Sequence, residues 1–272
     1  MDREPTSIDA YPPHEIARRV ERLGVAKARS DALSLLVLAV LAGAFISLGA
    51  LFFTVVVTGS ELGFGPTRLI GGVSFALGLI LVVVAGAELF TGNNLIAMAW
   101  ASGLIRFRDV VRNWLLAYVG NVIGCLGTLL LVVCSGTAGL DDGAVGDTAA
   151  RIARAKAELP LVEVFARGIL CNALVCMAVW LANGARSVTD KILAVLFPVT
   201  AFVVAGFEHS IANWFFLPYG IVVDAQAVSI AGAVRNLAVA TAGNVVGGTL
   251  LVAGVYWVAY LRGDHRGGDG RA

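Results

Sequence analysis

Residues 206–213 read GFEHSIAN, and this polar stretch interrupts an apolar run that extends from about 192 to 217. An apolar segment of about 20 residues is long enough to cross a bilayer as a helix. Lipid cannot satisfy backbone N–H and C=O groups, so a broken helix at membrane depth is tolerated where protein buries it or where it lines a cavity. The stretch therefore predicts a membrane helix that breaks at the wall of a pore.

A second stretch of the same kind, GAELFTGNN at 86–94, interrupts the apolar run from about 69 to 103. Its Gly, Glu and Asn match those of the first stretch at a constant offset of 120 residues. Further along, Asn113 followed by GNV at 120–122 recurs as Asn236 followed by GNV, at an offset of 123. Two matches at nearly one offset predict an internal repeat whose two breaks correspond to each other.

The composition indicates a membrane protein, because 58% of the residues are apolar, 14% are charged and the mean hydropathy is +0.84. These values leave too little polar surface for a water-soluble globule. Six runs are long enough to cross a bilayer, at about 32–58, 69–103, 114–134, 161–183, 192–217 and 229–261.

Three spans in each half is an odd number, so the second copy must enter the membrane from the opposite side. We therefore expect an all-α membrane protein with six transmembrane helices in a 3+3 inverted repeat, covering about 32–135 and 161–261. The second and fifth helices are the broken ones, and the site should lie near the midplane between the halves.

Charge sets the expected orientation. Fourteen of the 20 lysines and arginines lie in the N-terminal tail, the 104–113 and 184–191 loops and the C-terminal tail, so both termini are predicted to be cytoplasmic. The domain organisation that follows is a cytoplasmic tail at 1–31, a channel domain at 32–261 and a glycine-rich, disordered tail at 262–272.

Within the N-terminal tail, residues 12–29 place Ile16, Val20 and Leu23 on one face of a helix with arginines opposite. This amphipathic helix is expected either to anchor the chain at the membrane interface or to gate the cytoplasmic mouth.

Several function classes are excluded by composition. A net charge of +1 and a pI near 7.7 give no basic excess for nucleic-acid binding. The four cysteines lie in or beside apolar runs without metal-ligand spacing, so we expect buried thiols and no metal site. No cofactor motif is present, so no cofactor is expected.

The polar residues at the two breaks are the candidate functional groups. Glu88 and Glu208 each follow a break glycine, where a carboxylate can accept hydrogen bonds from unwound N–H groups, and we assign them and Asn213 a structural role. His209 is the one histidine inside an apolar span, and imidazole titrates near neutrality. The half-helix that starts near Ser210 favours an anion beside His209. Thr91 adds a hydroxyl from the matching break.

The chain resembles the formate/nitrite transporter family, which includes formate, nitrite and hydrosulfide channels. The resemblance is carried by GAELFTGNN (86–94), ILCNALVCMAVW (169–180), GFEHSIANWFFLP (206–218) and NLAVATAGNVVGG (236–248). It implies an aquaporin-like protomer with six spans, and a homopentamer in which each protomer has its own pore and lipid plugs the central axis. It also implies the cytoplasmic (inner) membrane of a prokaryote.

The same resemblance implies roles for single residues. The family's central histidine falls on His209, its loop threonine on Thr91, its polar partner on Asn172 and its vestibule lysine on Lys156. Trp214 departs from the family pattern, since many members carry methionine there. The hydrophobic constrictions on either side of the centre would be formed by Phe75, Leu79, Phe90 and Phe202, with Leu89 and Val175 facing them.

These residues lead to a mechanistic expectation. Lys156 should concentrate small monovalent anions electrostatically at the outer mouth. Formate, or else nitrite or hydrosulfide, would take a proton near His209 and pass the constriction as the neutral acid, because burying an unpaired ion costs far more. The partners are therefore these anions, protons, the lipid bilayer and further copies of the chain.

Three alternatives stay open at this point. In the first, the anion is never protonated and His209 is a fixed hydrogen-bond donor. The second is an intramembrane enzyme that uses Glu208 and His209 as an acid/base pair, but the sequence has no activated nucleophile, so we expect no enzyme. The third is a neutral-solute channel, which the missing paired Asn-Pro-Ala boxes disfavour.

Overall fold

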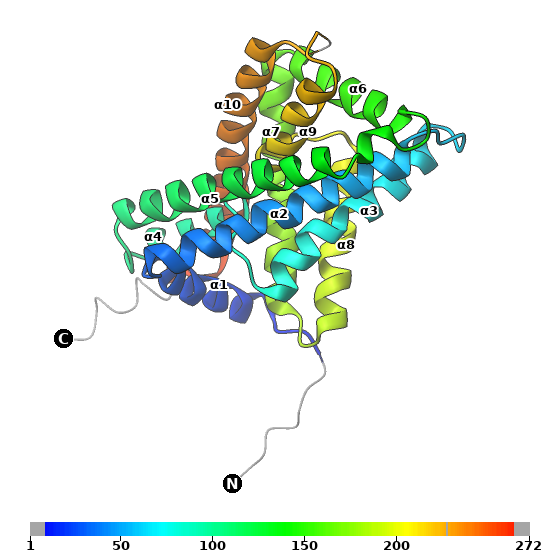
Figure 1. Ribbon diagram of the computed structural model, residues 1–272. Coiled ribbons are helices and arrows are strands. Elements are labelled where there is room, and N and C mark those ends of the chain that lie inside the picture. Colours follow the sequence, from blue (N-terminus) through cyan, green and yellow to red (C-terminus); the bar gives the residue numbers. More distant parts are fainter. Residues whose placement is uncertain (1–8, 227, 264–272) are drawn as a thin grey trace, which may run out of the picture.

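The computed structural model describes residues 9–226 and 228–263, and all regular secondary structure in those ranges is helical (Figure 1). The predicted disordered tail lies outside the described residues from position 264 onward. In the first half the helices are α1 (Pro13–Ala28), α2 (Ala32–Val57), α3 (Phe64–Ala85), a 3-10 turn (Gly92–Ile96), α4 (Ala97–Ala101) and α5 (Phe107–Cys134).

The second half is built from a similar series. Its elements are a 3-10 turn (Thr137–Gly139), α6 (Ala144–Glu158), α7 (Leu161–Gly184), α8 (Val188–Val204), α9 (Ser210–Val223), α10 (Ile230–Val246), a π-helical stretch (Gly247–Gly254) and α11 (Val255–Tyr260).

Five helices within the described ranges are long and apolar enough to cross a membrane: α2, α3, α5, α7 and the continuous helix Ile230–Tyr260. The span expected over 192–217 is divided between α8 and α9, which have 17 and 14 residues. Helix α5 begins at Phe107, ahead of the predicted start near 114. Its first turns contain polar residues, which a search for apolar runs does not include.

The start of α2 shows how polar caps define these helices. The Asp31 carboxylate accepts a hydrogen bond from the Ser34 N–H over 3.0 Å, which satisfies one of the free donors of the first turn. The Ser34 backbone hydrogen bond also lowers the pKa of Asp31. A charged N-cap of this kind stabilises the helix at the edge of its apolar run.

Helix α2 packs on α3 and α5, while α7 packs on α8 and α10, and α3 lies against α8 where the halves meet (Figure 1). Glycines permit the close helix contacts. A Cβ on Gly43 would lie 2.0 Å from the Asn121 carbonyl oxygen, and one on Gly247 would lie 2.1 Å from that of Ile169. Only the absence of a side chain allows backbones to approach this closely.

The predicted amphipathic helix is α1. Its Ile16 and Val20 are buried and belong to a cluster with Leu95, Met98 and Trp180. The third predicted apolar position, Leu23, is instead 44% exposed. Helix α1 therefore docks on the protein beside the first break, a contact that amphipathic periodicity alone does not specify.

Candidate permeation site

Both breaks open at a glycine in the left-handed backbone region. Helix α3 ends at Ala85 and Gly86 has φ 84°, while α8 ends at Val204 and Gly206 has φ 71°. Residues with a Cβ reach this region at a cost, whereas glycine does so freely. After each glycine the chain runs without helical structure until Gly92 or Ser210, where the next helical segment begins.

The second break is held by a buried ion pair. The Lys156 Nζ lies 2.9 Å from Glu208 Oε1, and the two side chains are only 16% and 3% exposed. Asn213 Nδ2 donates to Glu208 Oε2 over 2.7 Å, and Asn236 Nδ2 donates to the same oxygen over 3.1 Å. The carboxylate thus has one cation and two amides as partners, as a buried charge requires.

The first break has a counterpart of this network. The Lys27 Nζ lies 2.8 Å from both Glu88 carboxylate oxygens. Asn93 Nδ2 donates to Glu88 Oε2 over 2.8 Å and to Asn113 Oδ1 over 2.9 Å. In the second network, Asn213 Nδ2 likewise donates to Asn236 Oδ1 over 2.8 Å. The residues that matched in sequence therefore make matching contacts.

Two further asparagines tie each break to a neighbouring helix. Asn121 Nδ2 donates to the Glu88 carbonyl over 2.9 Å and to the Ala39 carbonyl over 2.7 Å. Asn244 Nδ2 does the same for the carbonyls of Glu208 and Gly168, over 2.9 and 2.8 Å. These bonds satisfy backbone groups that lipid would leave unpaired.

These contacts revise one expectation and add one residue to the site. The side-chain carboxylates of Glu88 and Glu208 accept from lysine and asparagine side chains, where unwound backbone N–H groups were expected as donors. Lys27 was not predicted at all. A signal for it exists in the sequence, because Ala-Lys-Ala occurs both at 26–28 and around Lys156 at 155–157.

His209 and Thr91 meet at the centre of the molecule. The His209 Nε2 lies 3.0 Å from the Thr91 hydroxyl oxygen, and both side chains are buried. On the other side of the ring, Nδ1 accepts a hydrogen bond from the Ala212 N–H over 3.0 Å, so His209 is the N-cap of α9. A neutral imidazole with an accepting Nδ1 carries its hydrogen on Nε2, which then donates to Thr91.

Asn172 lies on α7 and holds the loop that contains Thr91. Its Nδ2 lies within hydrogen-bond distance of the Thr91 carbonyl (3.2 Å), the Asn94 Oδ1 (2.8 Å) and the Asn244 carbonyl (2.7 Å). The side chain is completely buried. These contacts use its amide hydrogens within the protein, so Asn172 positions Thr91.

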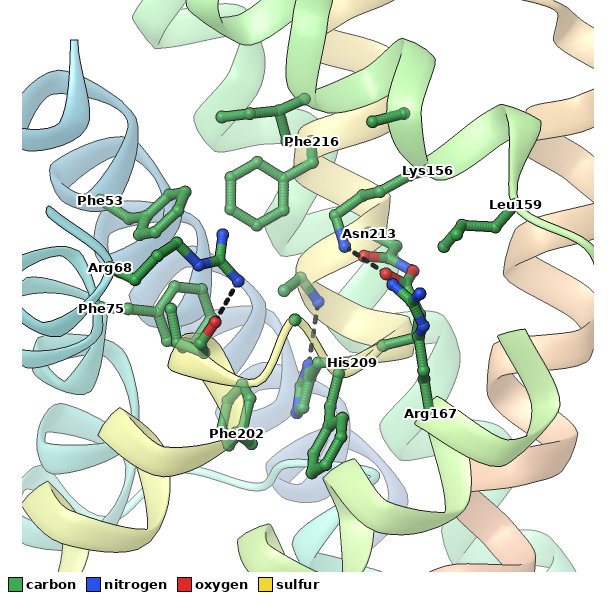
Figure 2. Close-up of a pocket in the computed structure, with 17 residues that line it drawn as sticks. Phe53, Arg68, Phe75, Lys156, Leu159, Arg167, Phe202, His209, Asn213 and Phe216 are labelled. Carbon is green, nitrogen blue, oxygen red and sulfur yellow. Dashed lines mark hydrogen bonds and ion pairs between the residues drawn. The ribbon is translucent and has the colours of Figure 1, made fainter. Parts of the chain in front are cut away.

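His209 lines a cavity of about 250 Å³ (Figure 2). Phe75 and Phe202 line it together with His209, and their rings meet edge to face at 5.7 Å. The Phe202 ring also stacks on the imidazole at 6.0 Å with an angle of 14° between the planes. Lys156, Arg68 and Arg167 line the same cavity.

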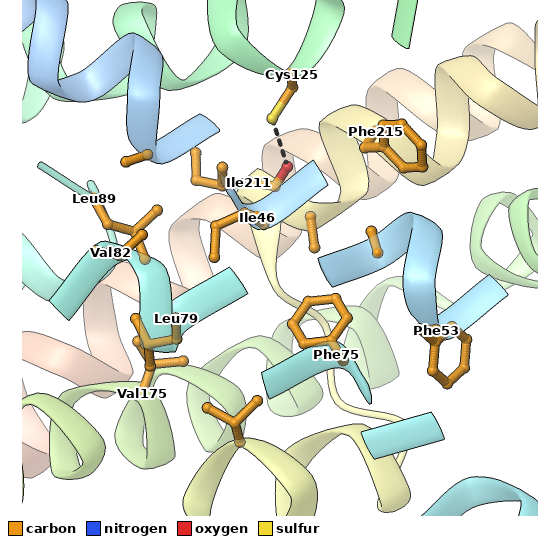
Figure 3. Close-up of a cluster of buried hydrophobic side chains, with 14 of the residues drawn as sticks. Ile46, Phe53, Phe75, Leu79, Val82, Leu89, Cys125, Val175, Ile211 and Phe215 are labelled. Carbon is orange, nitrogen blue, oxygen red and sulfur yellow. Dashed lines mark hydrogen bonds between the residues drawn. The ribbon is translucent and has the colours of Figure 1, made fainter. Parts of the chain in front are cut away.

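A second cavity of about 330 Å³ opens from the end that carries α1. Leu79, Leu89 and Gly92 line it, together with Lys27 and Glu88. Leu79 and Leu89 belong to the same buried apolar cluster as Phe75 and Phe202, which line the first cavity (Figure 3). An apolar barrier therefore separates two cavities that each carry a Lys–Glu pair.

The remaining expected residues lie in different places. Val175 is buried and belongs to the same apolar cluster as Leu79 (Figure 3). Phe90 is not among the residues that line either cavity, and its ring packs edge-on against that of Tyr118 at 5.0 Å. Trp214 donates its Nε1 hydrogen to the Tyr118 hydroxyl over 2.9 Å. Both aromatic residues thus contact Tyr118, and neither lines one of these two cavities.

The Lys156 ammonium group lines this cavity and is paired there with the Glu208 carboxylate. Arg167 is paired as well, with Glu163 at 2.6 Å. Arg68 instead donates to the carbonyls of Val203 and Val204 at the end of α8. Among the described residues that line this cavity, Arg68 is therefore a cation without an ion-pair partner. Sequence inspection missed it because its partners are backbone groups 135 and 136 positions away.

Within residues 9–226 and 228–263, no group of three or more His, Cys, Asp and Glu side chains has metal-site geometry. The site is thus built from hydrogen-bond donors, two ion pairs and apolar rings.

The family model of the formate/nitrite transporter matches residues 14–258 of the chain. The chain is 40% identical over 278 aligned residues to the formate channel FocA of Escherichia coli, covering 95% of this chain and 98% of the relative. It is 34% identical to the formate channel FocA of Haemophilus influenzae, covering 97% and 99%.

Solved structures give the same picture. A structure described as a pentameric formate channel with formate bound is similar with a TM-score of 0.80 and 38% identity, covering 85% of this chain and 98% of that one. A structure described as an FNT family ion channel is similar with a TM-score of 0.82 and 28% identity, covering 90% and 98%.

Proposed function

Because this chain belongs to the formate/nitrite transporter family, we propose that it forms a homopentameric membrane channel whose protomers each conduct formate. The observation that carries the proposal is the pair of cavities on either side of the His209–Thr91 contact, the first lined by His209 and the second by Gly92, which follows Thr91. Such an arrangement suits a small solute that crosses one short apolar barrier.

The protomer is proposed to cross the membrane six times as two inverted halves. Helices α8 and α9 together would form the crossing that neither is long enough to make alone. The matched Lys27–Glu88 and Lys156–Glu208 networks support this arrangement, since each half supplies the same contacts at its own break. With Lys27 on the side of both termini, α1 would face the cytoplasm.

The proposed path runs from the Lys156 cavity past Phe75 and Phe202 to His209, and then past Leu79 and Leu89 to the Lys27 cavity. Apolar side chains on both sides of the centre exclude a hydrated ion, because a buried and unpaired charge costs several kcal/mol or more. Formate would therefore cross the barrier as formic acid, and weak acids would be favoured over the anions of strong acids.

The proton would reach formate through water in the cavity. The His209 Nδ1 is occupied by the Ala212 N–H, so the neutral ring has a single hydrogen, on Nε2. Donation of that hydrogen orients an acceptor, while its complete transfer would leave an anionic ring. His209 and the Thr91 hydroxyl would thus hold the carboxylate while a proton arrives from the solvent side.

The same geometry favours a second candidate mechanism, in which the anion is never protonated. Both ring nitrogens of His209 are hydrogen-bonded, as expected for a fixed donor that solvates a passing anion. Nitrite or hydrosulfide as the substrate is a further alternative, because the described contacts depend on charge and size rather than on a carbon atom.

Proteoliposomes test the proposed function directly. We expect rapid uptake of labelled formate, weaker uptake of nitrite and hydrosulfide, and no glycerol uptake above that of empty liposomes. Leu79→Trp should block uptake by filling the barrier, while Leu115→Trp is a matched control at a position that is 62% exposed on α5. Equal formate uptake by both variants, or glycerol uptake equal to that of formate, would contradict the proposal.

A further inference from the structure

A third cavity, of about 300 Å³, lies where the N-terminal segment meets the turn between α7 and α8. Arg19, Arg186 and Lys191 line it, together with Tyr11 and Asn183. Two alanines, Ala182 and Ala185, complete the lining, and no carboxylate is among the lining residues that the structure describes. The cavity is therefore a basic pocket formed by two segments that are far apart in sequence.

Tyr11 places the two guanidinium groups. The guanidinium carbons of Arg19 and Arg186 each lie 4.0 Å from the centroid of the Tyr11 ring, which attracts cations through its π-face. The Tyr11 N–H donates to the Gly184 carbonyl over 3.0 Å, and Arg186 Nε donates to the Asp9 carbonyl over 2.6 Å. The ring and both cations are thus held before any ligand binds.

The three cations leave most of their donors available. Within the described residues, neither Arg19 nor Lys191 has a hydrogen bond or ion pair to a carboxylate. Like charges at short range repel each other, so an anion that contacts all three would relieve that repulsion. A guanidinium group also has five donors in a planar fork that fits the oxygens of a phosphate.

We propose that this pocket binds a phosphate group with two negative charges, carried by a soluble phosphate or by the headgroup of a phosphate monoester lipid. Three cations around one cavity match a multivalent tetrahedral anion better than a monovalent carboxylate such as formate. The bound phosphate would link Arg19 of α1 to Arg186 and Lys191 at the start of α8.

The pocket adjoins the permeation path without belonging to the barrier. Ala182, Asn183 and Lys191 line both this pocket and the second cavity. Helix α1 also carries Lys27, which holds Glu88 at the first break. A phosphate that fastens α1 to α8 would therefore stabilise α1 in the position in which Lys27 reaches the break.

The test measures binding of radiolabelled inorganic phosphate to detergent-solubilised protein by equilibrium dialysis at constant ionic strength. We expect one phosphate per chain, with at least tenfold weaker binding in Arg19→Gln/Arg186→Gln and in Lys191→Gln. Within the described residues the Lys191 side chain has no hydrogen bond or ion pair, so Lys191→Gln should leave the fold intact. Arg22→Gln/Arg108→Gln loses the same net charge outside the pocket and should bind like the unchanged protein.

A second arm identifies the source of the phosphate. The protein is placed in nanodiscs with phosphatidic acid or with phosphatidylcholine alone, and the lipid retained after purification is measured by mass spectrometry. Selective retention of phosphatidic acid that is lost in the pocket variants supports a lipid headgroup, and dialysis binding supports a soluble phosphate.

The proposal is overturned if neither source binds, or if the pocket variants and the control bind equally. It is also overturned if formate displaces bound phosphate as effectively as the same concentration of sulfate does. The pocket would then be only an extension of the formate path.

Discussion

The imidazole Nε2 of His209 lies 3.0 Å from the hydroxyl oxygen of Thr91, although 118 positions separate the two residues. One side chain comes from each broken segment, so this contact joins the two breaks beside the first cavity, which His209 lines. The contact requires the hydroxyl group of Thr91, so substitutions at position 91 can test its role.

Thr91→Val removes the hydroxyl and keeps the shape of the side chain. We expect formate uptake to fall at least tenfold, together with a loss of about 1–3 kcal/mol of stability, because the buried His209 Nε2 hydrogen loses its acceptor. Uptake into proteoliposomes and the thermal unfolding of the pentamer measure the two effects. Thr91→Ser retains the hydroxyl and should keep most of the uptake; a serine variant as inactive as the valine variant would show that the hydroxyl is not the cause.

His209→Asn tests the proposed proton step. Asparagine is a good N-cap, so its side chain can still accept from the Ala212 N–H and α9 should be preserved. If formate is protonated at this site, uptake by the variant should alkalise the donor side less per formate moved. The measurement is formate flux and pH change on the same liposomes, using protein that elutes as a pentamer.

A matched variant separates this role from capping. His209→Ala loses both the ring and the cap, so it should reduce the amount of folded pentamer by more than His209→Asn does. An unchanged ratio of protons to formate in well-folded His209→Asn protein would remove His209 from the proton step.

The two ion pairs should differ in their effect on stability. Lys156→Met leaves the Glu208 carboxylate, which is 3% exposed, without its cation, and we expect a loss of about 3–5 kcal/mol. Lys27→Met should cost less, since Lys27 and Glu88 are 32% and 15% exposed and water can replace the lysine. Unfolding in a mixed-detergent titration gives both values. Addition of Glu208→Gln to Lys156→Met should restore part of the loss.

Arg68 is expected to attract anions to the cavity that contains Lys156. Arg68→Gln keeps a donor for the Val203 carbonyl but removes the charge. Formate uptake should fall severalfold at low ionic strength, and the difference should shrink near 1 M salt, where the Debye length is about 3 Å. Arg151→Gln removes an equal charge from the exposed face of α6 and should have little effect. A loss of formate uptake that does not change with salt would indicate that Arg68 serves only to cap the last carbonyls of α8.

Orientation is tested by single cysteines. Cys134 is replaced by serine because it is exposed, while Cys125, Cys171 and Cys176 are buried and can stay. A cysteine at the exposed position of Ala155 should react with a membrane-impermeant thiol reagent added outside the cell. A cysteine in place of Ser187 should react only after the cells are opened, and the reverse pattern would invert the proposed topology.

Much of the helical framework could be predicted from the sequence, because a long apolar run indicates a helix that lipid surrounds. Helix α2 follows the run at 32–58 closely, and α7 follows that at 161–183. The predicted ends of the helices were less accurate where polar residues belong to a helix, as in the first turns of α5. Hydropathy responds to the lipid that surrounds a helix, and the polar ends of a helix lie outside that lipid.

The sequence alone identifies the residues that are costly to place in a membrane. Glu88, Glu208, His209 and the matched asparagines stand out because lipid cannot solvate them, so their presence in apolar runs predicts a site. The partners of these residues became known from the packing of the helices. Lys27 reaches Glu88 across 61 positions and Lys156 reaches Glu208 across 52, because α1 and α6 pack against the breaks. Such pairs depend on how helices pack, and the spacing of residues along one chain does not encode the distance between two helices.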